Sequence, residues 1–173
     1  MTWLILVPLL PLLTALLIAV SNRVQLEQHV KLGTLPIVTA FLGSAATLAF
    51  VSAQGPLTVR LYDPAPLAGF ALPLGFYIDR LSGVMMTLIT LVGTIIYLYS
   101  RGYMYQDRHY RRYMGLIALT TFVLLCMVSS ANLLMLFVFW QILSWLLFLL
   151  AHNHAHPATL SGACTTFSLL RLG

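Results

Sequence analysis

The residues with the clearest chemical potential lie along one apolar stretch in the second half of the chain. Gln141 lies near its middle, with Ser144 at i+3 and His152 at i+11, so a helix would place all three on one face. A neutral amide among membrane helices commonly makes an interhelical hydrogen bond, which is the favoured interpretation. The alternative is a neutral station on a hydrated ion path. The candidates for such a path are Gln141, Ser144, His152 and also Arg171, the only basic residue inside an apolar span.

Three histidines alternate in the loop that follows this stretch, at His152, His154 and His156. Imidazoles titrate near neutral pH and bind transition metals, so proton collection or a metal site is conceivable chemistry. Alternating histidines that end at Pro157 do not match a known ligand frame, however. An ordinary solvated helix end is the favoured interpretation, and the three residues are only weak candidates for metal ligands.

A second group of charged residues suits structural or interfacial roles. Asp79 precedes an apolar run, where a carboxylate caps exposed N–H groups and meets the positive end of the helix dipole, with Arg80 beside it. Arg108, Arg111 and Arg112 alternate with tyrosines, a pattern that suits anchoring at anionic lipid headgroups or docking of a cytoplasmic partner. Headgroup anchoring is the favoured interpretation of this cluster.

Catalytic residues are not apparent in the sequence. Its four acids, Glu27, Asp63, Asp79 and Asp107, all fall in loops or at span ends, whereas proton and ion relays need buried ionisable groups. A relay must therefore come from residues beyond 173 or from a partner. No quinone, flavin or iron–sulfur motif appears, so no cofactor is expected in this chain and a redox role would require partners. Cys126 and Cys164 lie far apart in apolar surroundings and are interpreted as packing residues.

The composition decides the class of protein that must position these residues. Of the 173 residues, 60% are hydrophobic and only 8% are charged, which indicates an integral membrane protein. A membrane-spanning helix takes about 20 residues, so about six spans would fill the chain. A nucleotide-binding or hydrolase domain is therefore excluded. The basic residues are too few and too dispersed for a nucleic-acid surface, and membrane lipid is the expected surrounding.

The apolar runs predict an all-α fold, a polytopic transmembrane helix bundle of about five to six helices. Residues 114–151 contain no charge and are too long for one span, so the polar group at Ser129–Asn132 should divide them. Residues 54–80 are rich in proline and glycine and predict a short extracytoplasmic hairpin, with strands at 57–62 and 74–78. The predicted helices cover residues 3–20, 33–53, 81–100, 114–130 and 133–151, and a sixth begins at 158–173. Because the sequence stops inside that element, we expect a split subunit or the N-terminal part of a longer one.

Basic residues in the loops predict the orientation of the bundle. The loops that follow the first and third spans hold six Lys and Arg residues, and the loops on the opposite side hold two. The positive-inside rule then places the N-terminus and residues 54–80 outside, in a bacterial cytoplasmic membrane.

Four short motifs resemble the N-terminal part of the antiporter-like membrane subunits. They are Leu74–Ser82, Tyr99–Met104, Asn132–Leu134 and Phe139–Trp140. This superfamily includes chain 5 of NADH:quinone oxidoreductase, the large Mrp antiporter subunits and the membrane subunit of DAB-type inorganic carbon transporters. The resemblance covers residues from about 74 onward and, more weakly, the first two spans, so residues 1–173 are expected to form one N-terminal part of an antiporter-like domain.

Departures from the motif favour one branch of this superfamily. In the respiratory and Mrp relatives a glutamate of the proton path follows the Phe-Trp pair, but Gln141 occupies that position here, and Thr165 stands where complex I relatives tend to carry lysine. The DAB-type subunits are similar in lacking that glutamate. The resemblance thus implies a cation-conducting subunit of a bicarbonate or CO2 uptake complex, with a large peripheral zinc-containing partner. Two alternatives remain, a proton-translocating chain 5-like subunit with other complex I-like subunits as partners, and a non-conducting assembly subunit.

Overall fold

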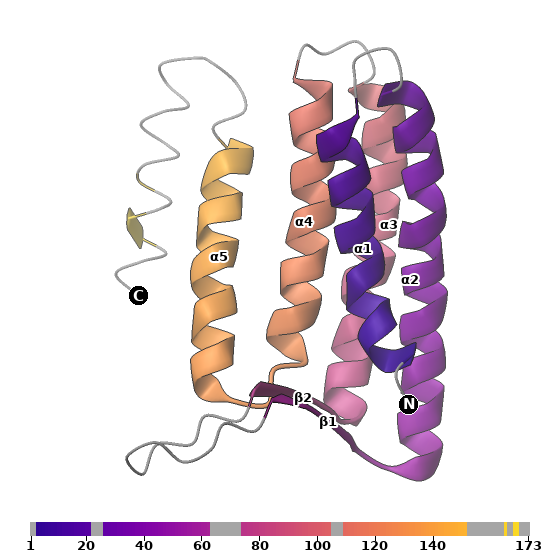
Figure 1. The fold of residues 1–173 in the computed structure, drawn as a ribbon, viewed down its shortest axis with the longest axis vertical. Coiled ribbons are helices and arrows are strands. Elements are labelled where there is room, and N and C mark those ends of the chain that lie inside the picture. The colour runs from indigo at the N-terminus through magenta and orange to yellow at the C-terminus, as the bar shows by residue number, and fades with distance from the viewer. Residues whose placement is uncertain are drawn as a thin grey trace.

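The computed structural model describes residues 3–21, 26–62, 74–104 and 109–151 and the separate positions 165, 168 and 169. Within these residues the chain forms helices and one two-stranded sheet (Figure 1). The elements in chain order are α1 (Trp3–Val20), α2 (Leu26–Gln54), β1 (Leu57–Tyr62), β2 (Leu74–Ile78), α3 (Arg80–Tyr103), α4 (Tyr110–Val128) and α5 (Leu133–Ala151).

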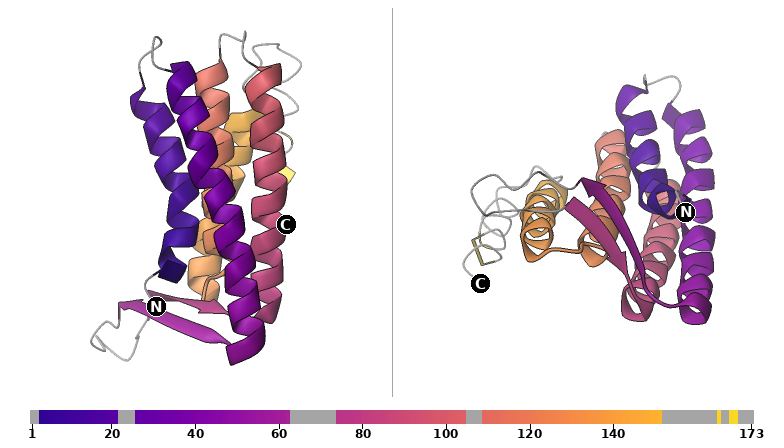
Figure 2. Two further views of the ribbon diagram at one scale, coloured as in Figure 1. Left: turned by 90° about the vertical axis from the view of Figure 1, so that its right-hand side faces the viewer. Right: turned by 60° about the horizontal axis from the view of Figure 1, so that its bottom comes forward.

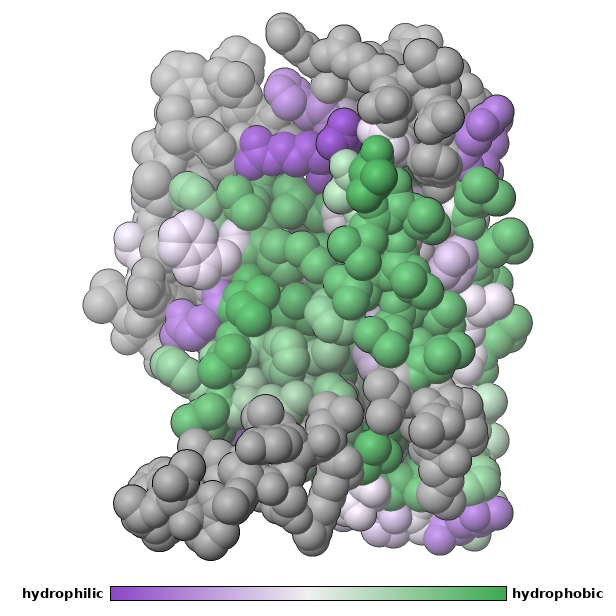
Figure 3. All heavy atoms as spheres, viewed as in Figure 1, coloured by the Kyte–Doolittle hydropathy of each residue, from purple (hydrophilic) through white to green (hydrophobic). Residues whose placement is uncertain are grey.

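Most of the described helices have the length and composition of membrane spans. Four of them qualify, at Val30–Gln54, Arg80–Tyr103, Tyr110–Val128 and Leu133–Leu150, and Leu6–Val20 is a shorter apolar helix. The 24 residues of α3 extend about 36 Å at 1.5 Å per residue, enough to cross a hydrocarbon core of about 30 Å. The described surface in Figure 3 is largely hydrophobic along the helices, with hydrophilic residues toward the ends. The prediction of an all-α multi-pass membrane bundle is confirmed.

Helices α1 to α4 pack side by side, and α5 lies at the edge of this group against α4 (Figures 1 and 2). Successive helices run in opposite directions, so α1 and α3 end where α2 and α4 begin. We call this the arginine end, because Arg101, Arg111 and Arg112 lie there. The opposite end carries the two strands and is called the hairpin end.

Two helices begin earlier in the structure than the hydrophobic pattern indicates. Helix α2 starts at Leu26 and not at residue 33, and α4 starts at Tyr110 and not at residue 114. Both extensions contain charged residues, Glu27 and Lys31 in α2 and Arg111 and Arg112 in α4, and these charges lower the hydropathy of the two segments. Glutamate, glutamine, lysine and arginine are nevertheless good helix formers, so a helix continues beyond the apolar segment into the interface. Tyr110 is also buried, which ties the first turn of α4 to the bundle.

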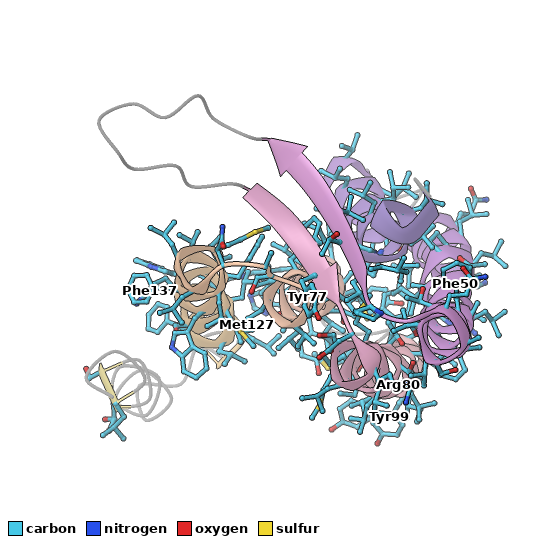
Figure 4. The ribbon with its side chains drawn as sticks, turned by 90° about the horizontal axis from the view of Figure 1, so that it is seen from below. Phe50, Tyr77, Arg80, Tyr99, Met127 and Phe137 are labelled. Atoms are coloured by element: carbon cyan, nitrogen blue, oxygen red, sulfur yellow. The ribbon has the colours of Figure 1, made fainter. Side chains whose placement is uncertain are left out.

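The predicted hairpin is present, with both strands at the expected positions. β1 pairs antiparallel with β2, with Leu57 opposite Ile78 and an irregularity between Arg60 and Tyr62. Figure 4 shows the two strands crossing the end of the helix bundle. Ile78 is buried with residues of α1, α2, α3 and α4 in the core cluster at this end, so the hairpin is packed against the bundle.

The hairpin also pairs with the break between α4 and α5. The Tyr77 backbone N–H donates to the Ser129 carbonyl at 2.8 Å, and the Ala131 N–H donates to the Gly75 carbonyl at 3.1 Å. These bonds satisfy backbone groups that a helix interruption would leave without partners in an apolar environment. The break expected at residues 129–132 is therefore built jointly by its own polar residues and by β2.

The apolar core of the bundle has two parts, one toward each end. One cluster of buried residues at the arginine end includes Ile18, Val30, Tyr97 and Met114. A second cluster at the hairpin end includes Val7, Val51, Met86 and Leu125. These residues come from α1, α2, α3 and α4, so the four helices share one interior. Helix α5 contributes to neither cluster as a buried member.

Several sequence predictions lie outside the described residues. The sixth helix expected at 158–173 is represented only by positions 165, 168 and 169. Arg108, His152, His154, His156, Cys164 and Arg171 belong to segments that the structure does not describe.

Candidate functional site

Gln141 lies near the middle of α5, at the edge of the bundle. It is half-buried, and its side-chain amide makes no hydrogen bond to any other residue that the structure describes. Trp140 and Trp145 on either side are 43% and 53% exposed, so this region of α5 is open to its surroundings. A primary amide at membrane depth is costly without a partner. The side chain is therefore available to a water molecule, an ion or a neighbouring helix.

Ser144 is buried, one turn away from Gln141 on the same helix. Its hydroxyl donates to the Trp140 carbonyl at 3.0 Å, a bond inside α5 that satisfies its donor. A serine in this arrangement still has lone pairs that accept a hydrogen bond. Ser144 can thus act as an acceptor beside Gln141, but the structure shows no direct bond between the two.

The other path and metal candidates, His152, Arg171, His154 and His156, all lie outside the described residues. Within the described part of the chain no group of three or more His, Cys, Asp or Glu side chains is placed to hold a metal ion.

Asp79 is the N-cap of α3 at the hairpin end. Its carboxylate accepts a hydrogen bond from the Ser82 backbone N–H at 2.7 Å. This bond, with a further contribution from the Ser82 side chain, lowers the pKa of Asp79 from its ordinary value of 3.8 because both donors favour the charged carboxylate. The adjacent Arg80 does not take part in the cap, since its guanidinium donates to the Ser52 carbonyl near the end of α2 at 3.1 Å. The pair therefore fixes the start of α3 against α2.

Arg111 and Arg112 differ in what they contact at the arginine end. The Arg111 guanidinium donates to the Ala19 carbonyl at the end of α1 at 2.8 Å. That contact places a cation at the negative end of the α1 dipole. Arg112 is exposed, and its guanidinium has no hydrogen-bond partner among the described residues. Of the two, only the Arg112 guanidinium makes no hydrogen bond to the described part of the bundle.

Hydroxyl groups inside the bundle were missed by the sequence reasoning. The Ser44 and Thr90 hydroxyls are 2.7 Å apart and join α2 to α3. The Tyr97 hydroxyl donates to the Val30 carbonyl at 3.1 Å, again between α3 and α2. The available signal was the recurrence of Thr at positions 87, 90 and 94, which share a helical face in an otherwise apolar run.

Glycines allow the close helix contacts beside these hydroxyls. A Cβ at Gly33 would lie 2.7 Å from both Thr14 Cγ2 and the Tyr97 hydroxyl, and one at Gly93 would lie 2.9 Å from Thr121 Oγ1. The positions therefore have no room for a larger side chain without movement of the neighbouring helix. The small residues thus permit the backbone approach that is typical of membrane helices.

The described interior is uncharged. No Asp, Glu, Lys, Arg or His among the described side chains is buried, and the buried polar residues there are threonines and serines. Such groups can donate and accept hydrogen bonds but do not titrate near neutral pH. This arrangement can hold helices together or line a path, but a proton relay would need ionisable groups from elsewhere.

Comparison with known proteins identifies related sequences over the central part of the chain. Residues 65–114 match the family described as NADH-Ubiquinone oxidoreductase (complex I), chain 5 N-terminus. This stretch includes β2, α3 and the start of α4. It also contains two of the motifs noted above, Leu74–Ser82 and Tyr99–Met104.

The curated relatives include three named NAD(P)H-quinone oxidoreductase subunit 5. The chloroplastic protein of Adiantum capillus-veneris is 33% identical over 111 residues, covering 64% of this chain and 15% of the relative. That of Chaetosphaeridium globosum is 29% identical over 166 residues, which are 92% of this chain and 25% of the relative. The organellar chromatophore protein of Paulinella chromatophora is 29% identical over 158 residues, covering 87% of this chain and 23% of the relative. The chain therefore spans a quarter or less of the length of these relatives.

These matches confirm the resemblance at the level of the superfamily. They fall on the same motifs and extend over most of the described helices. A closer relation to the DAB-type branch stays a prediction.

Proposed function

We propose that this chain, which belongs to the superfamily of antiporter-like membrane subunits, forms the N-terminal helices of an ion-translocating subunit. The complex in which it works resembles an NAD(P)H-quinone oxidoreductase, and its partners are complex I-like subunits. The observation that carries this proposal is the similarity to subunit 5 proteins over 87% and 92% of the chain. Redox chemistry belongs to the partners in this proposal, and the chain contributes to ion passage.

The uncharged interior supports a scaffold role for the described helices. Hydroxyl and carbonyl groups join α1, α2 and α3 inside the bundle, while the described side chains supply no buried carboxylate or lysine. Ion relays in membranes are normally built from such ionisable groups. Titrating groups therefore come from other helices or from partner subunits, and this bundle holds them in position.

Gln141 and Ser144 on α5 are the described residues that we place next to the ion path. The half-buried amide without a described partner and the adjacent buried hydroxyl offer hydrogen bonds to a water file at mid-membrane depth. His152 and Arg171 complete the proposed path beyond the described residues. One charge that crosses a membrane potential of 100 mV exchanges roughly 2.3 kcal/mol, and this is the free energy that ion passage couples to the reaction of the complex.

A second function, inorganic carbon uptake of the DAB type, is favoured by one specific residue. Gln141 cannot titrate, yet it occupies the position at which the resemblance implies a glutamate in the respiratory relatives. In this case the chain would conduct a cation while a large peripheral zinc-containing subunit converts CO2 and bicarbonate. The coupling ion would be H+ or Na+.

Identification of the native partners separates the two functions. The intact protein is extracted in a mild detergent, and everything that co-purifies is identified by mass spectrometry and analysed for metals and flavin. We expect subunits that carry flavin and iron–sulfur clusters. Recovery of a large zinc protein as the sole partner would overturn the main proposal in favour of carbon uptake.

Substitution of Gln141 tests its place on the path. Gln141→Glu introduces a titratable group and is expected to change both the rate and the pH dependence of ion uptake into vesicles that contain the complex. Ile142→Val, at the adjacent exposed position, is the matched control and is expected to leave both unchanged. Unchanged uptake with Gln141→Glu would make a place on the path untenable.

A further inference from the structure

A groove lies on the outer face of α3, close to the arginine end. It has a volume of about 400 Å3 and runs from Ile95 and Ile96 past Tyr99 to Tyr103, with Tyr113 of α4 on its other side. Figure 4 places Tyr99 on the side of α3 that faces away from the other helices. The groove therefore opens toward the membrane and not toward the interior of the bundle.

The wall of this groove changes in character along its length. Ile95, which is 58% exposed, belongs to the apolar part of α3, whereas Tyr99 and Tyr103 belong to its last turns. The two tyrosine rings are stacked, with centroids 5.8 Å apart and planes 13° apart. Tyrosines are enriched where a membrane helix meets the headgroup layer. The groove thus extends from hydrocarbon depth to the interface, which matches the path of a lipid acyl chain.

An exposed arginine in the first turn of α4 adjoins one of the residues that line the polar end of the groove. Arg112 directly precedes Tyr113 and is exposed, and its guanidinium has no hydrogen-bond partner among the described residues. It lies in the first turn of α4, at the positive end of that helix dipole. No carboxylate is present among the side chains that the structure describes at this end.

We infer that this groove binds an anionic phospholipid of the membrane, with one acyl chain along the Ile95–Tyr103 wall and the phosphate near Arg112. The aliphatic and aromatic side chains pack against the lipid acyl chain, and the positive charge of Arg112 attracts the anionic headgroup. The site is separate from Gln141, which lies on α5. Its existence does not depend on which complex the chain serves.

Photo-cross-linking tests the site in the native assembly. The complex is extracted with its partner subunits, placed in lipid nanodiscs, and labelled with photoactivatable phosphatidylglycerol or, separately, phosphatidylcholine. Cross-linked peptides are then mapped by mass spectrometry. We expect labelling of residues 95–104 and 113 that is stronger with phosphatidylglycerol. Tyr99→Ala with Tyr103→Ala should reduce labelling with both lipids, and Leu88→Ala, an exposed position on α3 that does not line the groove, should not.

The headgroup contact is tested by two substitutions of one residue. Arg112→Gln should lower the preference for phosphatidylglycerol by about fivefold, since one basic residue near a membrane surface supplies a factor of this size. Arg112→Lys keeps the charge and should keep the preference. Equal labelling by both lipids in the wild type, labelling unaffected by the double tyrosine substitution, or a preference unaffected by Arg112→Gln would each overturn the proposal. Absence of lipid labelling because a partner subunit covers the groove would overturn it as well.

Discussion

At the scale of single residues, the bundle is held together by hydroxyl groups that bond across helices. Thr14 donates to the Gly33 carbonyl at 3.3 Å, Tyr97 to the Val30 carbonyl, and Ser44 pairs with Thr90. Helix association in lipid gains little from the hydrophobic effect, so such bonds and close packing carry much of the specificity. The interior of this protein is therefore polar but neutral.

The Ser44–Thr90 contact should contribute a measurable coupling energy. Ser44→Ala, Thr90→Val and the double variant form a cycle, and we expect a coupling of about 0.5–1.5 kcal/mol, the range of interhelical hydrogen bonds in membranes. The magnitude is limited because Thr90 also bonds the Met86 carbonyl of its own helix. Reversible unfolding in bicelles provides the measurement, and additive single effects would contradict the assignment.

Asp79 should stabilise α3 in a pH-dependent manner. Asp79→Ala is expected to cost about 1 kcal/mol, a usual value for loss of an N-cap, and Asp79→Asn should retain most of the cap. Because the folded-state pKa is lowered, the charge-dependent part is present above the ordinary value of 3.8 and is lost as pH falls through the folded-state pKa. Thermal unfolding of wild type and Asp79→Asn between pH 3 and 7 (about one unit below to three above the ordinary value) checks this. An equal pH dependence in both would show that Asp79 is not responsible.

At the scale of elements, glycine sets how closely α3 approaches α4. Gly93→Ala would place a Cβ 2.9 Å from Thr121 Oγ1 and 3.1 Å from its Cγ2, so the helices must separate. We expect a loss of about 1–3 kcal/mol in unfolding free energy, as for other overpacked sites. Gly102→Ala on the same helix is the matched control, because nothing lies within 4 Å of its added Cβ. Equal stability of the two variants would contradict the packing described.

Much of the element structure was readable from the sequence. Proline and glycine between residues 54 and 80 marked the hairpin, because proline cannot continue a helix and glycine loses backbone freedom in one. Ser129–Asn132 marked the helix break, because short polar side chains compete for backbone hydrogen bonds. The starts of α2 and α4 were misplaced because hydropathy marks the membrane core and not the polar turns that extend a helix beyond it. Local chemistry thus located interruptions better than helix starts.

The contacts between elements could not be predicted in the same way. Which hydroxyl meets which carbonyl depends on how each helix is rotated, and the sequence alone does not fix that rotation. The pairing of β2 with the α4–α5 break likewise joins segments that are distant in sequence. For the candidate site, the sequence predicted that Gln141 and Ser144 lie on one helix. It did not predict which groups of other helices lie beside them, and those groups decide their role.

At the scale of the whole molecule, the two ends of the bundle differ in charge. The described part of the arginine end carries Lys31, Arg101, Arg111 and Arg112 with Glu27, whereas the described part of the hairpin end carries Arg60 and Arg80 with Asp79. The positive-inside rule predicts that the arginine end faces the cytoplasm or the equivalent compartment. The hairpin and the N-terminus then face the opposite side.

Cysteine labelling tests this orientation. In a variant in which Cys126 and Cys164 are replaced by serine, Thr58→Cys should react with a membrane-impermeant maleimide added to intact cells or organelles. His109→Cys, exposed at the other end, should react only after permeabilisation. The reverse pattern would place the bundle the other way round.

Ion uptake driven by NAD(P)H is the most direct test of the proposed function. Inside-out membrane vesicles are prepared with the chain present, with its gene deleted and with the gene restored, and NAD(P)H-driven, quinone-dependent ion uptake is recorded in each. We predict that uptake falls to background without the chain and returns when the wild-type chain is restored. Unchanged NAD(P)H-driven uptake in the deleted strain, with inorganic carbon uptake lost in its place, would contradict a role in an NAD(P)H-quinone oxidoreductase-like complex.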